Sequence, residues 1–160
     1  MLFRIDSVAT TLSSIRGATD RQTPVTHPMQ RKDCSMNILE QARPQATPIP
    51  GVAHATWAGA ADGLSQLSVW RQTLAPGAAT PPHRHDCDEV VLCLQGHGEV
   101  HSEGQVRRFG ADSTVALPAG RDHQIFNTGA MPMELIAAFA ATPVGTHLPD
   151  GQPLELPWRT

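Results

Sequence analysis

From residue 51 onward, short runs rich in apolar and β-branched residues alternate with turn signals about every eight to twelve residues. Glycine and proline mark most of these turns, for example at Ala75-Pro76-Gly77 and Pro118-Ala119-Gly120. No stretch in this region has the 3.6-residue period of an amphipathic helix. The pattern predicts strands near residues 52–57, 64–74, 79–85, 88–94, 97–103, 105–109, 113–117, 123–128 and 133–141. Many short antiparallel strands of this kind predict an all-β sandwich or barrel.

One predicted strand, residues 88–94, has two apolar faces. Alternation places Glu89, Val91 and Cys93 on one face and Val90, Leu92 and Leu94 on the other. The strand near 133–141 has the same property. The interior of a small barrel covers only one face, so we expect the other to contact a second sheet, an N-terminal segment or another subunit. A homodimer is the expected assembly.

The 160 residues are enough for one domain with a proper core. Residues 1–50 have no sustained period and are expected to form an N-terminal leader. Within it, residues 1–35 are expected to be disordered or to arise from a non-native start, because a more ordered pattern begins only at Met36. Residues 51–141 are the predicted barrel domain. Residues 142–160 are a proline-rich tail expected to be extended.

The net charge of −3 gives no electrostatic reason to expect nucleic acid or an acidic membrane surface as a partner. No apolar run reaches the roughly 18 to 20 residues that a membrane span needs. The first residues lack the pattern of a secretory signal, so the expected location is cytoplasmic. The three cysteines form no CxxC pair and are expected to be free thiols.

Four residues have the types and spacing of a divalent-metal site. His83 and His85 are two residues apart, so on a strand they point to the same side. Glu89 has the same parity and can approach them if the chain bends between the two. His123 must come from a neighbouring strand. Ordinary polar strand residues are the alternative, but matching parity and flanking glycines favour a site for Zn, Mn, Fe, Ni or Co with one or two open positions.

The two segments also resemble those of a known superfamily. Residues 77–96 fit the pattern G-x5-H-x-H-x3-E-x6-G, and residues 118–127 fit P-x-G-x2-H-x3-N. Both patterns are those of the cupins, and the chain resembles a small single-domain cupin with a type-2 conserved barrel. The resemblance covers about residues 51–141. It implies a double-stranded β-helix, or jelly roll, of two antiparallel sheets with metal ligands His83, His85, Glu89 and His123. One departure, Asp112 where the cupin pattern has glycine, affects a turn.

A more specific resemblance is to the auxin-binding-protein branch of the cupins. It rests on residues 69–73, 75–77, 80–81, 83–90 and 122–127 and on Pro157-Trp158. In that branch zinc binds the carboxylate of an aryl-acetic acid while apolar and aromatic side chains hold the ring. The resemblance implies these substrate-binding residues: Trp70, Gln72, Thr80, Pro81 and Trp158. Strand alternation also places Trp70 and Gln72 on one face.

Two functions follow as hypotheses. The first is a metal-binding protein that coordinates a small aryl or short-chain carboxylate at the open metal position, within a barrel pocket. The alternative is a metal-dependent enzyme acting on a small organic acid or carbonyl compound, a dioxygenase with iron or an isomerase or lyase with zinc or manganese. No catalytic acid or base stands out beyond the metal set. His27, His54 and His147 have no partner at metal-ligand spacing.

Overall fold

A computed structural model describes residues 36–158. The expectations for residues 1–35 concern residues outside this range. The regular secondary structure of the described residues is almost entirely strand. These are β1 (Gln45–Ala46), β2 (Val52–Ala58), β3 (Ser68–Leu74), β4 (Arg84–His85), β5 (Glu89–Gln95), β6 (His97–Ser102), β7 (Gln105–Gly110), β8 (Thr114–Leu117), β9 (His123–Asn127), β10 (Met133–Phe139) and β11 (Thr146–His147).

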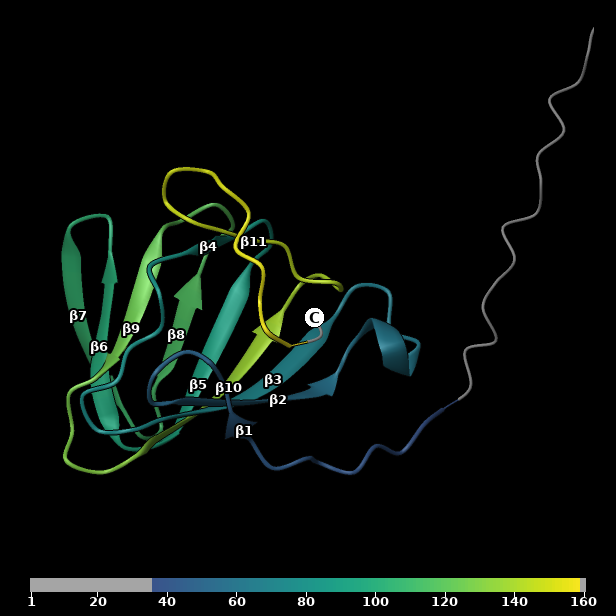
Figure 1. Ribbon diagram of the computed structural model, residues 1–160, viewed down its shortest axis with the longest axis horizontal. Helices are drawn as coiled ribbons and strands as arrows, with labels where there is room; N and C mark the ends of the chain where they lie inside the picture. Colours follow the sequence, from purple (N-terminus) through teal and green to yellow (C-terminus); the bar gives the residue numbers. More distant parts are fainter. Residues whose placement is uncertain (1–35, 159–160) are drawn as a thin grey trace, which may run out of the picture. The chain divides into compact units, whose positions relative to one another are not determined.

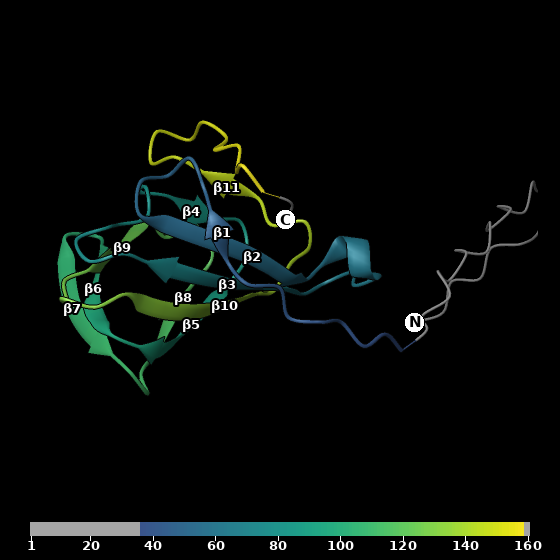
Figure 2. The same cartoon turned by 60° about the horizontal axis from the view of Figure 1, so that its bottom comes forward.

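The strands form two layers. The larger sheet has the order β1-β2-β3-β10-β5-β8, and a three-stranded sheet has the order β7-β6-β9. A two-stranded ladder of β11 and β4 lies at one end of the barrel (Figures 1 and 2). Isolated bridges, Ala79 to Phe126 and His83 to His123, join the segment before β4 to β9. Every strand pair in residues 36–158 is antiparallel, and the predicted all-β double-sheet barrel is confirmed.

Two predicted strands are shorter than the pattern suggested. The strand expected over 79–85 is reduced to β4 and two bridges, because Pro81 and Pro82 have no backbone N–H for a ladder. The strand expected over 64–74 begins only at Ser68. Before it, a 3-10 turn at Ala60–Asp62 is closed by the backbone N–H of Gly59, which donates to the Asp62 carboxylate at 2.9 Å.

The core lies between the two layers. Its largest fully buried side chains include Leu74, Met133, Leu135 and Phe139, all on the inward faces of β3 and β10. The opposite face of β5 is open in the single chain. The solvent-exposed fractions of Val90, Leu92 and Leu94 are 38%, 38% and 46%. The expected cover from a second subunit therefore remains a prediction.

The C-terminal segment folds back onto the barrel. Thr146 of β11 pairs with His85 of β4, and the Leu154 N–H donates to the Thr146 carbonyl at 2.9 Å. Beyond that point, Leu156 and Trp158 pack against the core. The tail thus supplies one wall of the barrel interior. Within the described residues, no helix has the length and apolar character needed to cross a membrane.

Candidate metal centre

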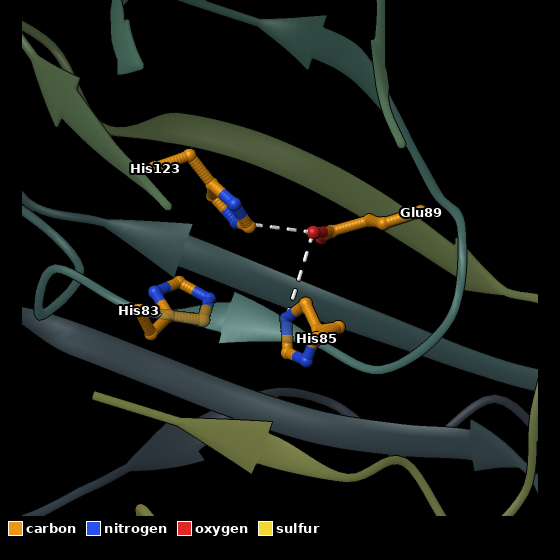
Figure 3. A group of neighbouring side chains, drawn as sticks. All are labelled: His83, His85, Glu89 and His123. Carbon is orange, nitrogen blue, oxygen red and sulfur yellow. Dashed lines mark ion pairs between the residues drawn. The ribbon is translucent and has the colours of Figure 1, made fainter. Parts of the chain in front are cut away.

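The four predicted ligands come from separate segments and meet in the barrel. His83 precedes β4, His85 lies in β4, Glu89 begins β5 and His123 begins β9. One ligand atom from each lies within 4.8 Å of the others. The chain bends at residues 86 and 87, which allows the Glu89 carboxylate to face the imidazoles. Figure 3 shows His85 and His123 directed at that carboxylate, with His83 beside them.

Backbone carbonyl groups fix the tautomer of every imidazole. His83 Nδ1 lies 2.7 Å from the Pro81 carbonyl oxygen, and His123 Nδ1 lies 2.9 Å from that of Arg121. His85 Nδ1 lies 3.2 Å from the carbonyl oxygen of Gly145. A carbonyl oxygen can only accept, so each Nδ1 carries the hydrogen and each neutral ring has its lone pair on Nε2. This is the arrangement that metal-binding histidines use.

Within residues 36–158, one oxygen of the Glu89 carboxylate is buried without a hydrogen bond. Its Oε2 lies 3.5 Å from His85 Nε2 and 3.2 Å from His123 Nε2. Although these distances are short, Glu89 Oε2 and His123 Nε2 are both buried without a hydrogen bond of adequate geometry. A buried carboxylate oxygen facing nitrogen lone pairs requires a cation between them or a proton on a ring. Three nitrogens and one carboxylate therefore fit a divalent metal ion.

The electrostatics of the cluster agree with this reading. Burial, with smaller contributions from His123 and His85, lowers the pKa of His83 to about 4. Burial also lowers the pKa of His85. For Glu89, burial acts to raise the pKa, but His123 and the other imidazoles outweigh it and hold the pKa below its usual value. The site therefore combines two imidazoles that favour the neutral form, His83 and His85, with an ionised carboxylate, which are protonation states that a metal ion needs.

The pKa of His123 is shifted in the opposite direction to the pKa values of His83 and His85. Burial alone would lower the pKa of His123, but the carboxylate of Glu89 and its close contact raise it above the usual value. A proton on His123 Nε2 can therefore neutralise the carboxylate when no cation does. A metal ion would have to displace that proton.

A largely apolar cavity opens from the cluster. All five predicted substrate-binding residues line it together with the four metal candidates, these being Trp70, Gln72, Thr80, Pro81 and Trp158. Side chains that the sequence did not single out complete the wall: Ile49, Val52, Val91, Ile125, Leu135, Ala137, Phe139, Leu154 and Leu156. The enclosed space is small, about 30 Å³, with the tail in this position. The cavity thus offers a metal-binding end and an apolar body.

Sequence reasoning missed one polar residue beside this cavity. His54 is 6% exposed, and its ring stacks on Trp158 with centroids 4.0 Å apart and planes 14° from parallel. Burial lowers its pKa to about 4. In the sequence, His54 has no partner at metal-ligand spacing. The available signal was alternation with Val52, which places His54 on the inward face of its strand.

Comparisons with known proteins agree with the fold and the motifs. A family model described as Cupin domain matches residues 70–139. The chain is 36% identical over 105 residues to Auxin-binding protein 1 of Arabidopsis thaliana, covering 59% of this chain and 53% of that protein. It is 34% identical over 136 residues to Auxin-binding protein T92 of Nicotiana tabacum, covering 73% of this chain and 72% of that protein.

Among solved structures, an oxalate oxidase in complex with the substrate analogue glycolate matches with a TM-score of 0.58 and 25% identity. The match covers 68% of this chain and 60% of that one. The chain spans about half the length of the Arabidopsis relative and about three quarters of the tobacco relative. By sequence, motifs and fold, this chain belongs to the auxin-binding-protein family of the cupins.

Proposed function

We propose that this chain binds one divalent metal ion through His83, His85, Glu89 and His123, and that the ion binds the carboxylate of a small organic acid in the cavity. One observation carries the proposal. Three Nε2 lone pairs with fixed tautomers converge on a buried carboxylate oxygen that has no hydrogen bond. That geometry is costly for a protein without a cation and favourable for one that binds it.

The charge and shape of the site support an anionic ligand. Three neutral imidazoles and one carboxylate leave a divalent ion with a formal charge of +1. Mn, Fe, Co, Ni and Zn can all accept a further ligand beyond these four, so a carboxylate can occupy an open position. The apolar walls would then hold the organic part of the acid.

Two classes of acid have support. The names of the auxin-binding relatives favour an aryl acid, and the glycolate complex of the similar oxalate oxidase favours a short-chain acid. With the tail in its present position, the small cavity suits a short-chain acid. An aryl acid requires the wall formed by Leu154, Leu156 and Trp158 to shift.

Metal analysis tests the proposal directly. The full chain would be stripped with a chelator, loaded separately with Zn, Mn and Fe, and its metal content measured by mass spectrometry. We expect one ion per chain, and loss of that ion in the double variant His83→Ala/His85→Ala. His101→Ala is the matched control, because His101 pairs with Glu99 away from the cluster. Unchanged metal content in the double variant would show that the ligand assignment is wrong.

A metal-dependent enzyme is the second candidate, with dioxygenase, isomerase and lyase chemistry as its forms. The observation that favours it is the 25% identity and shared fold with oxalate oxidase. A bound ion would supply Lewis-acid or redox chemistry at the open position. Incubation of each metal-loaded form with aryl and short-chain acids, following oxygen uptake and products, separates the two candidates. Tight binding with every acid recovered unchanged would argue against an enzyme.

We also propose that the protein is a homodimer. The support is the exposed apolar face of β5, formed by Val90, Leu92 and Leu94, on a strand whose other face is buried. Light scattering coupled to size-exclusion chromatography measures the assembly. A monomer at all concentrations would contradict this proposal. A cytoplasmic location remains a prediction from the sequence.

A further inference from the structure

A groove outside the metal cavity runs between the edges of the two sheets. One side is β8, the last strand of the larger sheet, and the other is β7, the last strand of the three-stranded sheet. The groove has a volume of about 650 Å³ and shares no lining residue with the metal cavity. It also contains none of the side chains of the proposed dimer face, which are Val90, Leu92 and Leu94. The groove is therefore a separate feature of the barrel.

The floor of the groove is apolar. In β8, Val115 and Leu117 lie opposite residues of β5 that face the core, so their side chains point between the two sheets. Val100 of β6 is 7% exposed and belongs to the same core cluster as Leu117. Phe109 of β7 packs against that cluster. An apolar side chain of a ligand could therefore rest on this floor.

One charged side chain shares the face of this floor. Arg107 of β7 lies directly opposite the buried Val100 of β6, and opposite residues in an antiparallel pair point to the same side. Arg107 is nevertheless exposed. Within residues 36–158 its guanidinium donates a hydrogen bond to Gln105 Oε1 at 3.2 Å and forms no ion pair. Its charge is therefore available to an anion in the groove.

The two other arginines of the groove differ from Arg107, because each has a carboxylate partner. Arg108 Nε lies 3.3 Å from an oxygen of Glu99. Arg121 forms an ion pair with Glu103. The positive charge that remains without a partner in the groove is therefore that of Arg107.

The backbone of β8 supplies the second binding feature. One edge of β8 pairs with β5, and among residues 36–158 no strand pairs with its other edge. Natural proteins usually protect such an edge with lysine, proline or an inward-pointing charge. The four residues of β8, Thr114–Leu117, include none of these, and Thr114 and Ala116 are exposed. An extended peptide can therefore pair with this edge.

We propose that the groove binds an extended peptide segment of another protein, which adds a strand to β8 and places an acidic side chain on Arg107. Alternate residues of a strand face the same side, so the recognised pattern is apolar-x-acidic-x-apolar, with the apolar side chains on the floor. A long-chain carboxylate would neutralise Arg107 but leave the backbone groups of the β8 edge without partners. A second copy of this chain would bring the same positively charged groove against itself if its β8 paired there.

Peptide binding to the full chain tests the charge. The probe is a fluorescein-labelled peptide with blocked ends, Thr-Val-Thr-Glu-Thr-Val-Thr, and the matched peptide has Gln in place of Glu. Fluorescence anisotropy should show about twofold to fivefold tighter binding of the Glu peptide, the range of one exposed ion pair. In Arg107→Gln the ratio of affinities should fall to one. The matched control Arg108→Gln should keep the ratio, because Arg108 already pairs with Glu99.

Two further measurements test the geometry. Arg107→Glu should reverse the preference, so that a peptide with Lys at the central position binds more tightly than the Glu peptide. Two peptides methylated at alternate backbone nitrogens test the strand pairing, because only one of the two sets of N–H groups faces β8. The peptide with that set blocked should bind about tenfold more weakly than the other.

Each outcome decides one part of the proposal. Equal affinity for the Glu and Gln peptides, or an unchanged ratio in Arg107→Gln, would overturn the role of Arg107. Equal affinity for the two methylated peptides would overturn strand pairing with β8. Binding of dodecanoate without binding of the Glu peptide would assign the groove to a long-chain acid and overturn the proposal. None of these results depends on the metal ligands, so each leaves the proposed function unaffected.

Discussion

The buried ring of His54 should make the stability of this protein depend on pH. Its pKa falls from 6.5 to about 4 because burial disfavours the charged ring. In the unfolded chain the same ring takes up a proton near pH 6.5. As the pH falls through this window, the unfolded state binds a proton that the folded state does not, and the free energy of unfolding decreases. The contribution of the neutral His54 ring to the free energy of unfolding is fully present above about pH 6.5 and is lost as the pH approaches 4.

The size of this effect follows from the same two pKa values. A difference of one pKa unit corresponds to about 1.36 kcal/mol, so the difference between 6.5 and about 4 changes the free energy of unfolding by at most about 3.4 kcal/mol. This is a large share of the roughly 5 to 15 kcal/mol that stabilises a typical domain. The variant His54→Phe keeps the ring that stacks on Trp158 but removes the titration.

Urea denaturation of the metal-free protein between pH 4 and pH 8 measures the effect. The other buried imidazoles titrate in both proteins, so the difference between the two pH profiles isolates His54. We expect His54→Phe to lose stability less steeply than the unaltered protein below pH 6.5. Parallel profiles for the two proteins would refute the argument and mean that His54 is as easily protonated in the folded state as in the unfolded chain.

Three further changes test the structure elsewhere. The Thr146 hydroxyl lies 3.1 Å from His85 Nδ1, so Thr146→Val should weaken metal binding about tenfold or more in a metal titration. The exposed control Thr114→Val should leave metal binding unchanged. A Cβ on Gly98 would lie 2.0 Å from a carbonyl oxygen of β9, so Gly98→Ala should lower the free energy of unfolding by about 1 to 3 kcal/mol or more in urea denaturation. Gly110→Ala should lower it less, because the nearest atom to a Cβ there lies 3.3 Å away. Leu92→Asp should convert a dimer to a monomer in light scattering without changing metal content, and a persistent dimer would contradict the proposed interface.

The sequence was sufficient to predict the fold class and the convergence of the metal candidates. Period-two alternation gave the inward face of β5, with Glu89, Val91 and Cys93 buried. His83 and His85 point to the same side, as predicted, even though β4 is short. The bridge between His83 and His123 keeps the chain extended there. These features depend on local patterns, which a single sequence displays.

Features that depend on distant segments could not be predicted in the same way. Nothing local indicates that Thr146 would pair with His85, or that the tail would place Trp158 over His54. Likewise, the pairing of His54 with Gln72 depends on the register of two strands separated by a turn. Register and chain reversal are set by packing over the whole barrel, so they became visible only in the structure.

The burial that suits the four-residue cluster to a metal ion also makes the cluster a source of instability when no cation is bound. Burial lowers the pKa of two of its imidazoles, and one carboxylate oxygen lacks a hydrogen bond. Such groups weaken the folded state unless a cation or a proton compensates them. A metal ion that binds only the folded chain adds about 1.4 kcal/mol for each tenfold excess over its Kd. If the chain binds a metal ion as proposed, its metal affinity and its folding stability are therefore coupled.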